Sequence, residues 1–268
     1  MKLNKLIAIA TISLLSGGIS MAQKALNLED IVAGNIIQTK GIGSMTWLKD
    51  GERYSRLENN KQTGGTDIVA YRAKDNSREV IIPSSLLTDK STGRPIPVRS
   101  VSWSADNEKI LIYNNTRRVW RYDTRGDYWV LNLKDGALRQ LGKGMPESSM
   151  MFAKFSPDGT RVAYVSNNNI YVEDIDSGKI TQLTKDGSDT IVNGTFDWVY
   201  EEEFSCRDGF RWSPDGKHIA YWQSDTKGTG VFDIINNVDS IYAKVIHFPY
   251  PKAGTCLLYT SPSPRDTR

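Results

Sequence analysis

The sequence is poor in the side chains that build metal centres and disulfide frameworks. Its 268 residues include only two cysteines, Cys206 and Cys256, and two histidines, His218 and His247. No group of histidine, cysteine and carboxylate residues has the spacing typical of a metal site, so we expect neither a metal nor another cofactor. The two cysteines could form one disulfide in an exported protein. Because Cys256 lies in an atypical segment, we interpret Cys206 as a small thiol that is at least partly buried.

An excess of charge of one sign is also absent. The chain has 34 lysines and arginines against 31 aspartates and glutamates, and the small surplus comes largely from its two ends. Basic residues do not cluster or interleave with aromatic residues, as they do in many nucleic-acid-binding proteins. We therefore expect no nucleic-acid partner.

Long hydrophobic runs are absent as well. The most apolar stretch, residues 6–15, is shorter than the roughly 20 residues that cross a bilayer. Residues 1–22 have the pattern of a secretory signal peptide, in which two lysines precede the apolar run and the small residues Ser20 and Ala22 suit cleavage before Gln23. We expect an exported protein, periplasmic or secreted, with an uncleaved N-terminal anchor as the alternative.

A short motif recurs four times, at intervals of 52 to 57 residues, beginning at Trp47, Trp103, Phe155 and Trp212. In each copy an aromatic residue ends one strand, a turn with Asp-Gly or Asp-Asn follows, and an alternating apolar run forms the next strand. This period suits the four strands of a propeller blade. The sequence therefore predicts an all-β fold, a partial β-propeller of about four blades over residues 40–255. Further strands are expected over residues 127–133 and 169–175.

The repeated turn motif, Ser-Pro-Asp-Gly in its clearest form, indicates the fold and leaves the function open. Turn chemistry alone explains it, because Pro and Asp-Gly supply the backbone angles that a tight turn needs. Propellers with unrelated functions share such turns, so a non-enzymatic periplasmic β-propeller that binds a partner protein remains the alternative interpretation of the chain.

The most unusual stretch is residues 197–204, DWVYEEEF, which contains three consecutive carboxylates among aromatic residues. Neighbouring like charges repel and resist removal from water. On a strand Glu202 and Glu203 would point to opposite faces, whereas in a helical turn they would diverge by only about 100°. We therefore expect a turn or short helix. A cationic amine would suit the pair, since each carboxylate at ~4 Å would attract it by roughly 4 kcal/mol before desolvation. A solvated acidic turn is the alternative.

The same stretch resembles the signature of the dipeptidyl peptidase IV family of serine exopeptidases. In that family a paired-glutamate element inside a β-propeller holds the amino terminus of the substrate. The resemblance implies that Glu202 and Glu203 bind the free amine of a peptide, while Glu201 precedes the pair.

A second segment, residues 119–123 (VWRYD), resembles the Trp-Arg element of the same family. The resemblance implies that Arg121 contacts the carbonyl oxygen of the residue that carries the free amine. The fixed donors of a guanidinium suit this role. The alternative is a surface arginine that pairs with Asp123 or Asp127.

The resemblance covers residues 23–255, where the stretch 248–254 matches another family segment, and it stops abruptly afterwards. Residues 256–268 fit no blade pattern, and we interpret them as a non-native tail. Full members of the family continue through an eight-bladed propeller into an α/β-hydrolase domain with a Ser-Asp-His triad.

The pentapeptide Gly-x-Ser-x-Gly of a nucleophile elbow does not occur in this sequence. We therefore expect no catalytic residues in this chain, which would be inactive alone and would need the absent hydrolase domain of the same protein. The implied substrates are peptides with a free N-terminus, with tripeptidyl release as a close variant. The full-length protein could form a homodimer.

Overall fold

The computed structural model describes residues 27–32, 41, 43–252, 254–255 and 259–260, so the expected signal peptide lies outside the described residues. The chain divides into two compact units, residues 1–43 and 44–268. In the described part of the first unit, helix α2 covers Leu28–Val32. Among the helices that the structure describes, none is long and apolar enough to cross a membrane.

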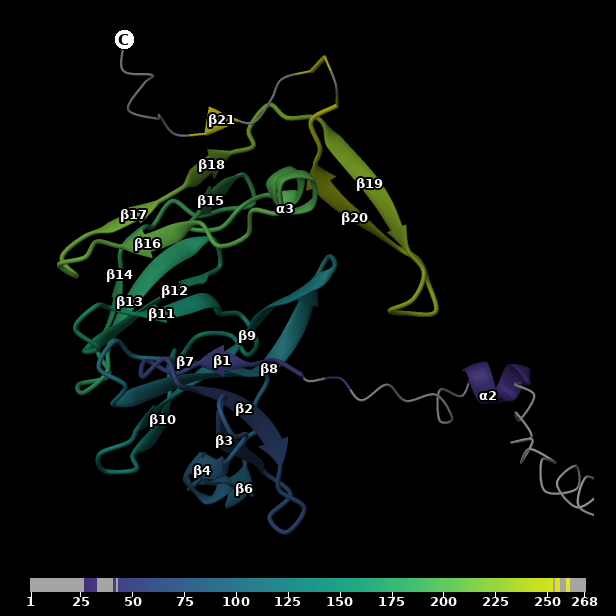
Figure 1. Cartoon of the computed structure of the whole chain (residues 1–268). Helices are drawn as coiled ribbons and strands as arrows, with labels where there is room; N and C mark the ends of the chain where they lie inside the picture. Colours follow the sequence, from purple (N-terminus) through teal and green to yellow (C-terminus); the bar gives the residue numbers. More distant parts are fainter. Residues whose placement is uncertain (1–26, 33–40, 42, 253, 256–258, 261–268) are drawn as a thin grey trace, which may run out of the picture. The chain divides into compact units, whose positions relative to one another are not determined.

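The second unit begins with three antiparallel sheets of four strands each, and in each sheet the strands pair in chain order (Figure 1). The first sheet consists of β1 (Thr46–Trp47), β2 (Arg53–Asn59), β3 (Thr66–Arg72) and β4 (Arg78–Ile82). The second consists of β7 (Ser100–Trp103), β8 (Lys109–Val119), β9 (Tyr122–Asn132) and β10 (Leu138–Gln140). The third consists of β11 (Met151–Phe155), β12 (Arg161–Ser166), β13 (Asn169–Asp174) and β14 (Ile180–Gln182). The short elements between the first two sheets are η1 (Ser84–Leu87), β5 (Thr88–Asp89) and β6 (Arg94–Pro95).

The remainder of the unit is less regular. The fourth copy of the repeat forms only a two-stranded hairpin, and the expected number of four blades therefore stays a prediction. Residues Tyr259–Thr260, in the segment interpreted as a tail, pair with β18. The elements are β15 (Ile191–Asn193), α3 (Trp198–Phe204), β16 (Phe210–Trp212), β17 (Ile219–Tyr221), β18 (Gln223–Asp225), β19 (Val231–Asn236), β20 (Lys244–Pro249) and β21 (Tyr259–Thr260).

The repeated motif forms the turn between the first two strands of each sheet. In three copies a serine hydroxyl donates to the aspartate two residues later and accepts from the backbone N–H five residues later, at 2.9 to 3.0 Å. The positive φ of the turn falls on Gly159 (66°) in the third sheet and on Asn107 (59°) in the second. The interpretation of the motif as turn chemistry is confirmed. The serines are Ser104, Ser156 and Ser213.

The core lies between successive sheets. One buried cluster joins the first sheet to the second, including Ile68 and Ile112, and another joins the second sheet to the third, including Val130 and Tyr164. A third cluster packs Phe210 of β16 against the third sheet. Sheets that follow each other along the chain and pack face to face make a partial β-propeller, so the predicted all-β fold class is confirmed.

The packing between the first two sheets generates a stability prediction at Ile112, whose side chain is fully buried. Because Ile112→Val removes one methylene from this cluster, we expect the free energy of unfolding to fall by about 1 kcal/mol. The matched control is Ile235→Val, since Ile235 is 63% exposed. Urea denaturation of both variants checks the prediction, and equal losses of stability would contradict the assigned core.

Candidate functional site

The acidic segment forms a short helix, α3, as predicted. Asp197 caps its N-terminus, where its carboxylate accepts hydrogen bonds from the backbone N–H groups of Val199 and Tyr200 at 3.3 Å. Ser205 adopts a left-handed conformation after the last turn, with φ of 54°. The cap residue and the left-handed terminus are typical helix boundaries. The helix is therefore defined at both ends by local chemistry.

Aromatic contacts fix α3 against neighbouring elements. The Trp198 ring lies 5.2 Å from the ring of Phe248 in β20 and 4.9 Å from that of Tyr250. Trp120, in the turn between β8 and β9, contacts Trp198 and Phe248 at centroid distances of 6.5 and 5.1 Å. These rings hold the tip of the β8–β9 hairpin and the helix together.

Arg121 occupies the same two-residue turn as Trp120. Val119 and Tyr122 are the last paired residues before it, and Trp120 has the positive φ of 52° that this hairpin turn places on its first residue. Because the ring of Trp120 is anchored beside α3, the next side chain, Arg121, reaches the helix.

The structure brings Arg121 and Glu202 together. Arg121 Nε lies 2.6 Å from Glu202 Oε2. The alternative pairings of Arg121 with Asp123 or Asp127 are not observed, since the Asp123 carboxylate lies near Arg99 and Arg118, and the Asp127 carboxylate accepts from the Asn115 amide and the Ser148 N–H. Two elements far apart in the sequence thus contribute opposite charges to one site.

The two glutamates of the predicted pair have different surroundings. The Glu202 side chain is only 5% exposed, whereas the Arg121 side chain is 76% exposed. Glu202 Oε1 is buried and has no hydrogen-bond partner among the described residues. Glu203 is exposed, and in the same part of the chain no partner of its carboxylate is found. A buried oxygen without a partner is unusual in a folded protein and marks a place where a donor would bind.

Sequence reasoning missed the first carboxylate of the run. Glu201 is 7% exposed, and its Oε1 is buried without a partner in the described structure. Burial raises the pKa of Glu201 to about 7, against the lowering effect of Arg207 and Arg125, and the charge of Glu202 adds to the rise. Only the helical period could have indicated this burial from the sequence. Successive residues of a helix point about 100° apart, so the three carboxylates cannot all face solvent in the same way.

A cation–π contact joins the segment after α3 to the β8–β9 hairpin. The Arg207 guanidinium lies over the Tyr122 ring at 3.7 Å. Among the described residues, no group of three or more histidine, cysteine and carboxylate side chains could hold a metal ion. The site is therefore built from carboxylates, guanidinium groups and aromatic rings.

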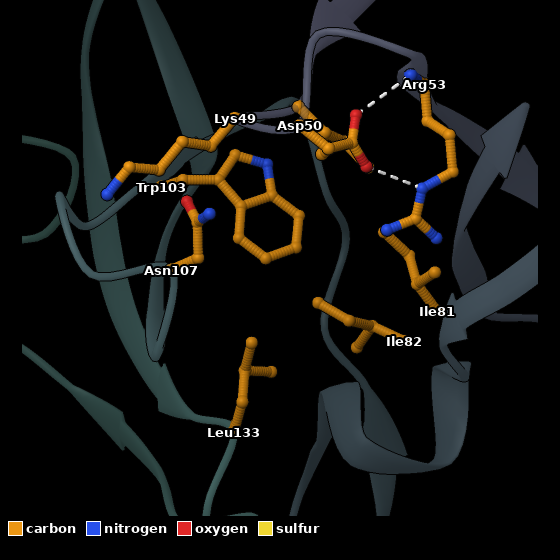
Figure 2. Close-up of a pocket in the computed structure, with 9 residues that line it drawn as sticks. Lys49, Asp50, Arg53, Ile81, Ile82, Trp103, Asn107 and Leu133 are labelled. Atoms are coloured by element: carbon orange, nitrogen blue, oxygen red, sulfur yellow. Dashed lines mark hydrogen bonds and ion pairs between the residues drawn. The ribbon is translucent and has the colours of Figure 1, made fainter. Parts of the chain in front are cut away.

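A separate pocket of about 290 Å³ lies between the first two sheets (Figure 2). There Asp50 accepts hydrogen bonds from the backbone N–H and Nε of Arg53 at 2.9 and 2.7 Å, and Trp103, Ile82 and Leu133 form apolar walls. Its lining contains none of the predicted site residues. We interpret it as a gap between blades next to a repeated turn.

The pKa of Glu201 generates a prediction on stability. The folded chain keeps this proton up to about pH 7, whereas an ordinary glutamate loses it near 4.5, so this group makes the free energy of unfolding fall as pH rises between these values. Glu201→Gln removes this pH-dependent loss of stability. We therefore expect the free energy of unfolding of the variant, minus that of the unmodified chain, to increase from pH 5 to pH 8, as measured by urea denaturation.

The control for this prediction is Glu203→Gln, which removes an exposed carboxylate from the same helix. An identical pH dependence of stability in Glu201→Gln and the unmodified chain would show that Glu201 is ionised throughout the range. That result would contradict its burial.

Comparisons with known proteins agree with the fold and the motifs. Residues 104–257, more than half of the chain, match the family model for the dipeptidyl peptidase IV (DPP IV) N-terminal region. The chain is 31% identical over 240 residues to dipeptidyl aminopeptidase B of Saccharomyces cerevisiae, which covers 84% of this chain and 27% of that protein. It is 32% identical over 166 residues to a probable dipeptidyl-aminopeptidase B of Chaetomium globosum, which covers 58% of this chain and 18% of that protein.

A solved structure shows the same architecture. The crystal structure of Porphyromonas gingivalis dipeptidyl peptidase 4 is similar with a TM-score of 0.74 and 26% identity, covering 89% of this chain and 33% of that chain. The chain thus spans a minor part of the length of the relatives that it matches. Because the family model covers more than half of its residues, the chain belongs to the dipeptidyl peptidase IV family and contains that family's N-terminal region.

Proposed function

We propose that this chain is the substrate-gating propeller of an exported serine-type dipeptidyl peptidase and binds the free N-terminus of peptides. In this proposal Glu202 and Glu203 accept hydrogen bonds from the α-ammonium group. Arg121 donates to the carbonyl oxygen of the same residue. The observation that supports the proposal most directly is Glu202 Oε1, a buried acceptor beside an exposed guanidinium for which the described residues offer no hydrogen-bond donor.

The charge distribution favours an ammonium group over a neutral amide. Glu202 and Glu203 bring two negative charges, and the nearby Arg121 compensates only one of them. A peptide α-ammonium carries one positive charge and three N–H donors, so it would balance the second carboxylate and satisfy Glu202 Oε1. At ~4 Å and an effective dielectric constant of ~20, each carboxylate would attract this cation by roughly 4 kcal/mol before desolvation. An acetylated N-terminus has neither the charge nor the three donors.

The ion pair between Arg121 and Glu202 positions the arginine to bind the carbonyl oxygen of the first residue of the peptide. Arg121 Nε is engaged by Glu202 Oε2 at 2.6 Å, which leaves the other guanidinium nitrogens of this largely exposed side chain to bind a carbonyl oxygen. A peptide would then be held at its first residue by an amine acceptor from α3 and a carbonyl donor from the β8–β9 hairpin. Such a clamp measures the distance from the N-terminus to the bond that is cut.

Hydrolysis itself belongs, in this proposal, to an α/β-hydrolase domain of the complete protein. The relatives are named dipeptidyl aminopeptidases, which supports a hydrolytic activity, and this chain covers only 18% and 27% of two of them, which leaves room for such a domain. A serine would attack the carbonyl after the second residue, a histidine would transfer the proton, and an aspartate would orient the histidine. If the reading frame beyond residue 255 encoded no Gly-x-Ser-x-Gly motif, the peptidase assignment would fail and a binding propeller would remain.

The proposal predicts a selective loss of activity in the complete protein. Glu202→Gln or Glu203→Gln should lower kcat/KM for substrates with a free amine by about 30-fold to 1,000-fold, because each removes a charged contact to the ammonium group. The matched control is Glu52→Gln, an exposed glutamate in the turn between β1 and β2, which should retain activity.

Substrate chemistry provides the decisive comparison in the same assay. N-acetylated substrates should be hydrolysed poorly by the unmodified protein, since they lack the cation. Equal rates for blocked and free substrates would rule out the binding of the amine by the two glutamates.

A further inference from the structure

A cavity of about 510 Å³ adjoins α3 and the β8–β9 hairpin. Its volume lies in the range of small-molecule sites. Its lining includes Glu201 and Arg125 but none of Glu202, Glu203 and Arg121. The cavity is therefore distinct from the proposed site for the peptide amine, although the same helix contributes to both.

The main polar feature of this cavity is Glu201. Its side chain is more than nine-tenths buried, and its Oε1 has no hydrogen-bond partner in the described part of the chain. A carboxyl oxygen that is buried without a donor costs free energy, and a positively charged donor would compensate for this cost. Glu201 is therefore a buried acceptor that a positively charged donor in the cavity would satisfy.

The charges around the cavity favour a cation. Asp189 and Asp197 line it together with Glu201, against the single guanidinium of Arg125. His247 also lines it, and its Nδ1 lies 2.6 Å from the carboxylate of Asp233. Arg207, outside the lining, adds a second guanidinium group near Glu201. Above about pH 7, where Glu201 is ionised, the three carboxylates outnumber these two permanent cations, and the charge balance favours a cationic ligand.

The walls favour an organic cation over a metal ion. Trp120, Trp198, Phe196 and Phe248 all line the cavity, and three of these rings contact one another at 5.1 to 6.5 Å. Aromatic faces attract ammonium groups and cover the apolar body of a ligand. The described residues contain no cluster that could hold a metal ion.

We propose that this cavity binds a small primary ammonium compound with an aromatic or aliphatic body. Its ammonium group donates to Glu201, and its body packs against the rings of Trp120, Trp198 and Phe248. The inference does not depend on the proposed peptidase function, because the residues that bind the two cations are different.

The test is a titration of the 268-residue chain with 2-phenylethylammonium at pH 8, where Glu201 is ionised, followed by isothermal titration calorimetry. Glu201→Gln preserves the shape of the side chain and removes its charge, so it should weaken binding by about tenfold or more. The double variant Glu202→Gln/Glu203→Gln is the matched control. It should bind the probe no more than about threefold more weakly than the unmodified chain, because neither residue lines the cavity and loss of the Glu202 charge favours the ionised form of Glu201.

A second arm uses the neutral analogue 2-phenylethanol with the unmodified chain, so the test does not depend on the folding of any variant. It should bind at least about tenfold more weakly than the ammonium compound, because a hydroxyl group carries no charge.

Equal binding of the two compounds, or undiminished binding to Glu201→Gln, would overturn the proposal. So would the absence of binding to the unmodified chain at about 10 mM. Loss of binding in the double variant would also overturn it, because the probe would then bind at Glu202 and Glu203. The proposed function of those two residues would stand.

Discussion

A carboxylate that is removed from water must find a compensating charge or keep a proton, and this constraint shapes the region around α3. Glu202 meets it with Arg121, whose Nε lies 2.6 Å away. Glu201, one residue earlier, faces two guanidinium groups only at longer range, and its pKa rises to about 7. Glu203 avoids the problem because it stays exposed. Three adjacent residues of one type therefore have three different surroundings.

The scaffold makes this arrangement possible through the packing of the sheets. Buried clusters between successive sheets fix the second sheet, whose central strands β8 and β9 continue into a hairpin. Its tip is anchored by the contacts of Trp120 with Trp198 and Phe248. Since Trp198 also begins α3, the same ring contacts position the arginine of one element and the glutamates of the other. The geometry of the site thus depends on apolar packing as much as on charge.

Sequence predicted the features that local chemistry controls. The turns of the repeat, the strands that follow them and the short helix at Glu202 all depend on residues close together in the chain, and all are confirmed. The irregular fourth repeat and the burial of Glu201 were not predicted, because both depend on packing between distant segments. The proximity of Arg121 and Glu202 was implied by a family resemblance, since no spacing in the sequence relates two residues that lie so far apart.

The central claim is that the carboxylate of Glu202 recognises the positive charge of a peptide N-terminus. A double-mutant cycle measures this interaction directly, by calorimetric binding of a free-amine tripeptide and its N-acetylated form to the unmodified chain and to Glu202→Gln. The account predicts a coupling free energy of at least about 1.5 kcal/mol between the ammonium group and the carboxylate, as found for close charge pairs. A coupling free energy near zero would contradict it, because the amine would then bind independently of Glu202.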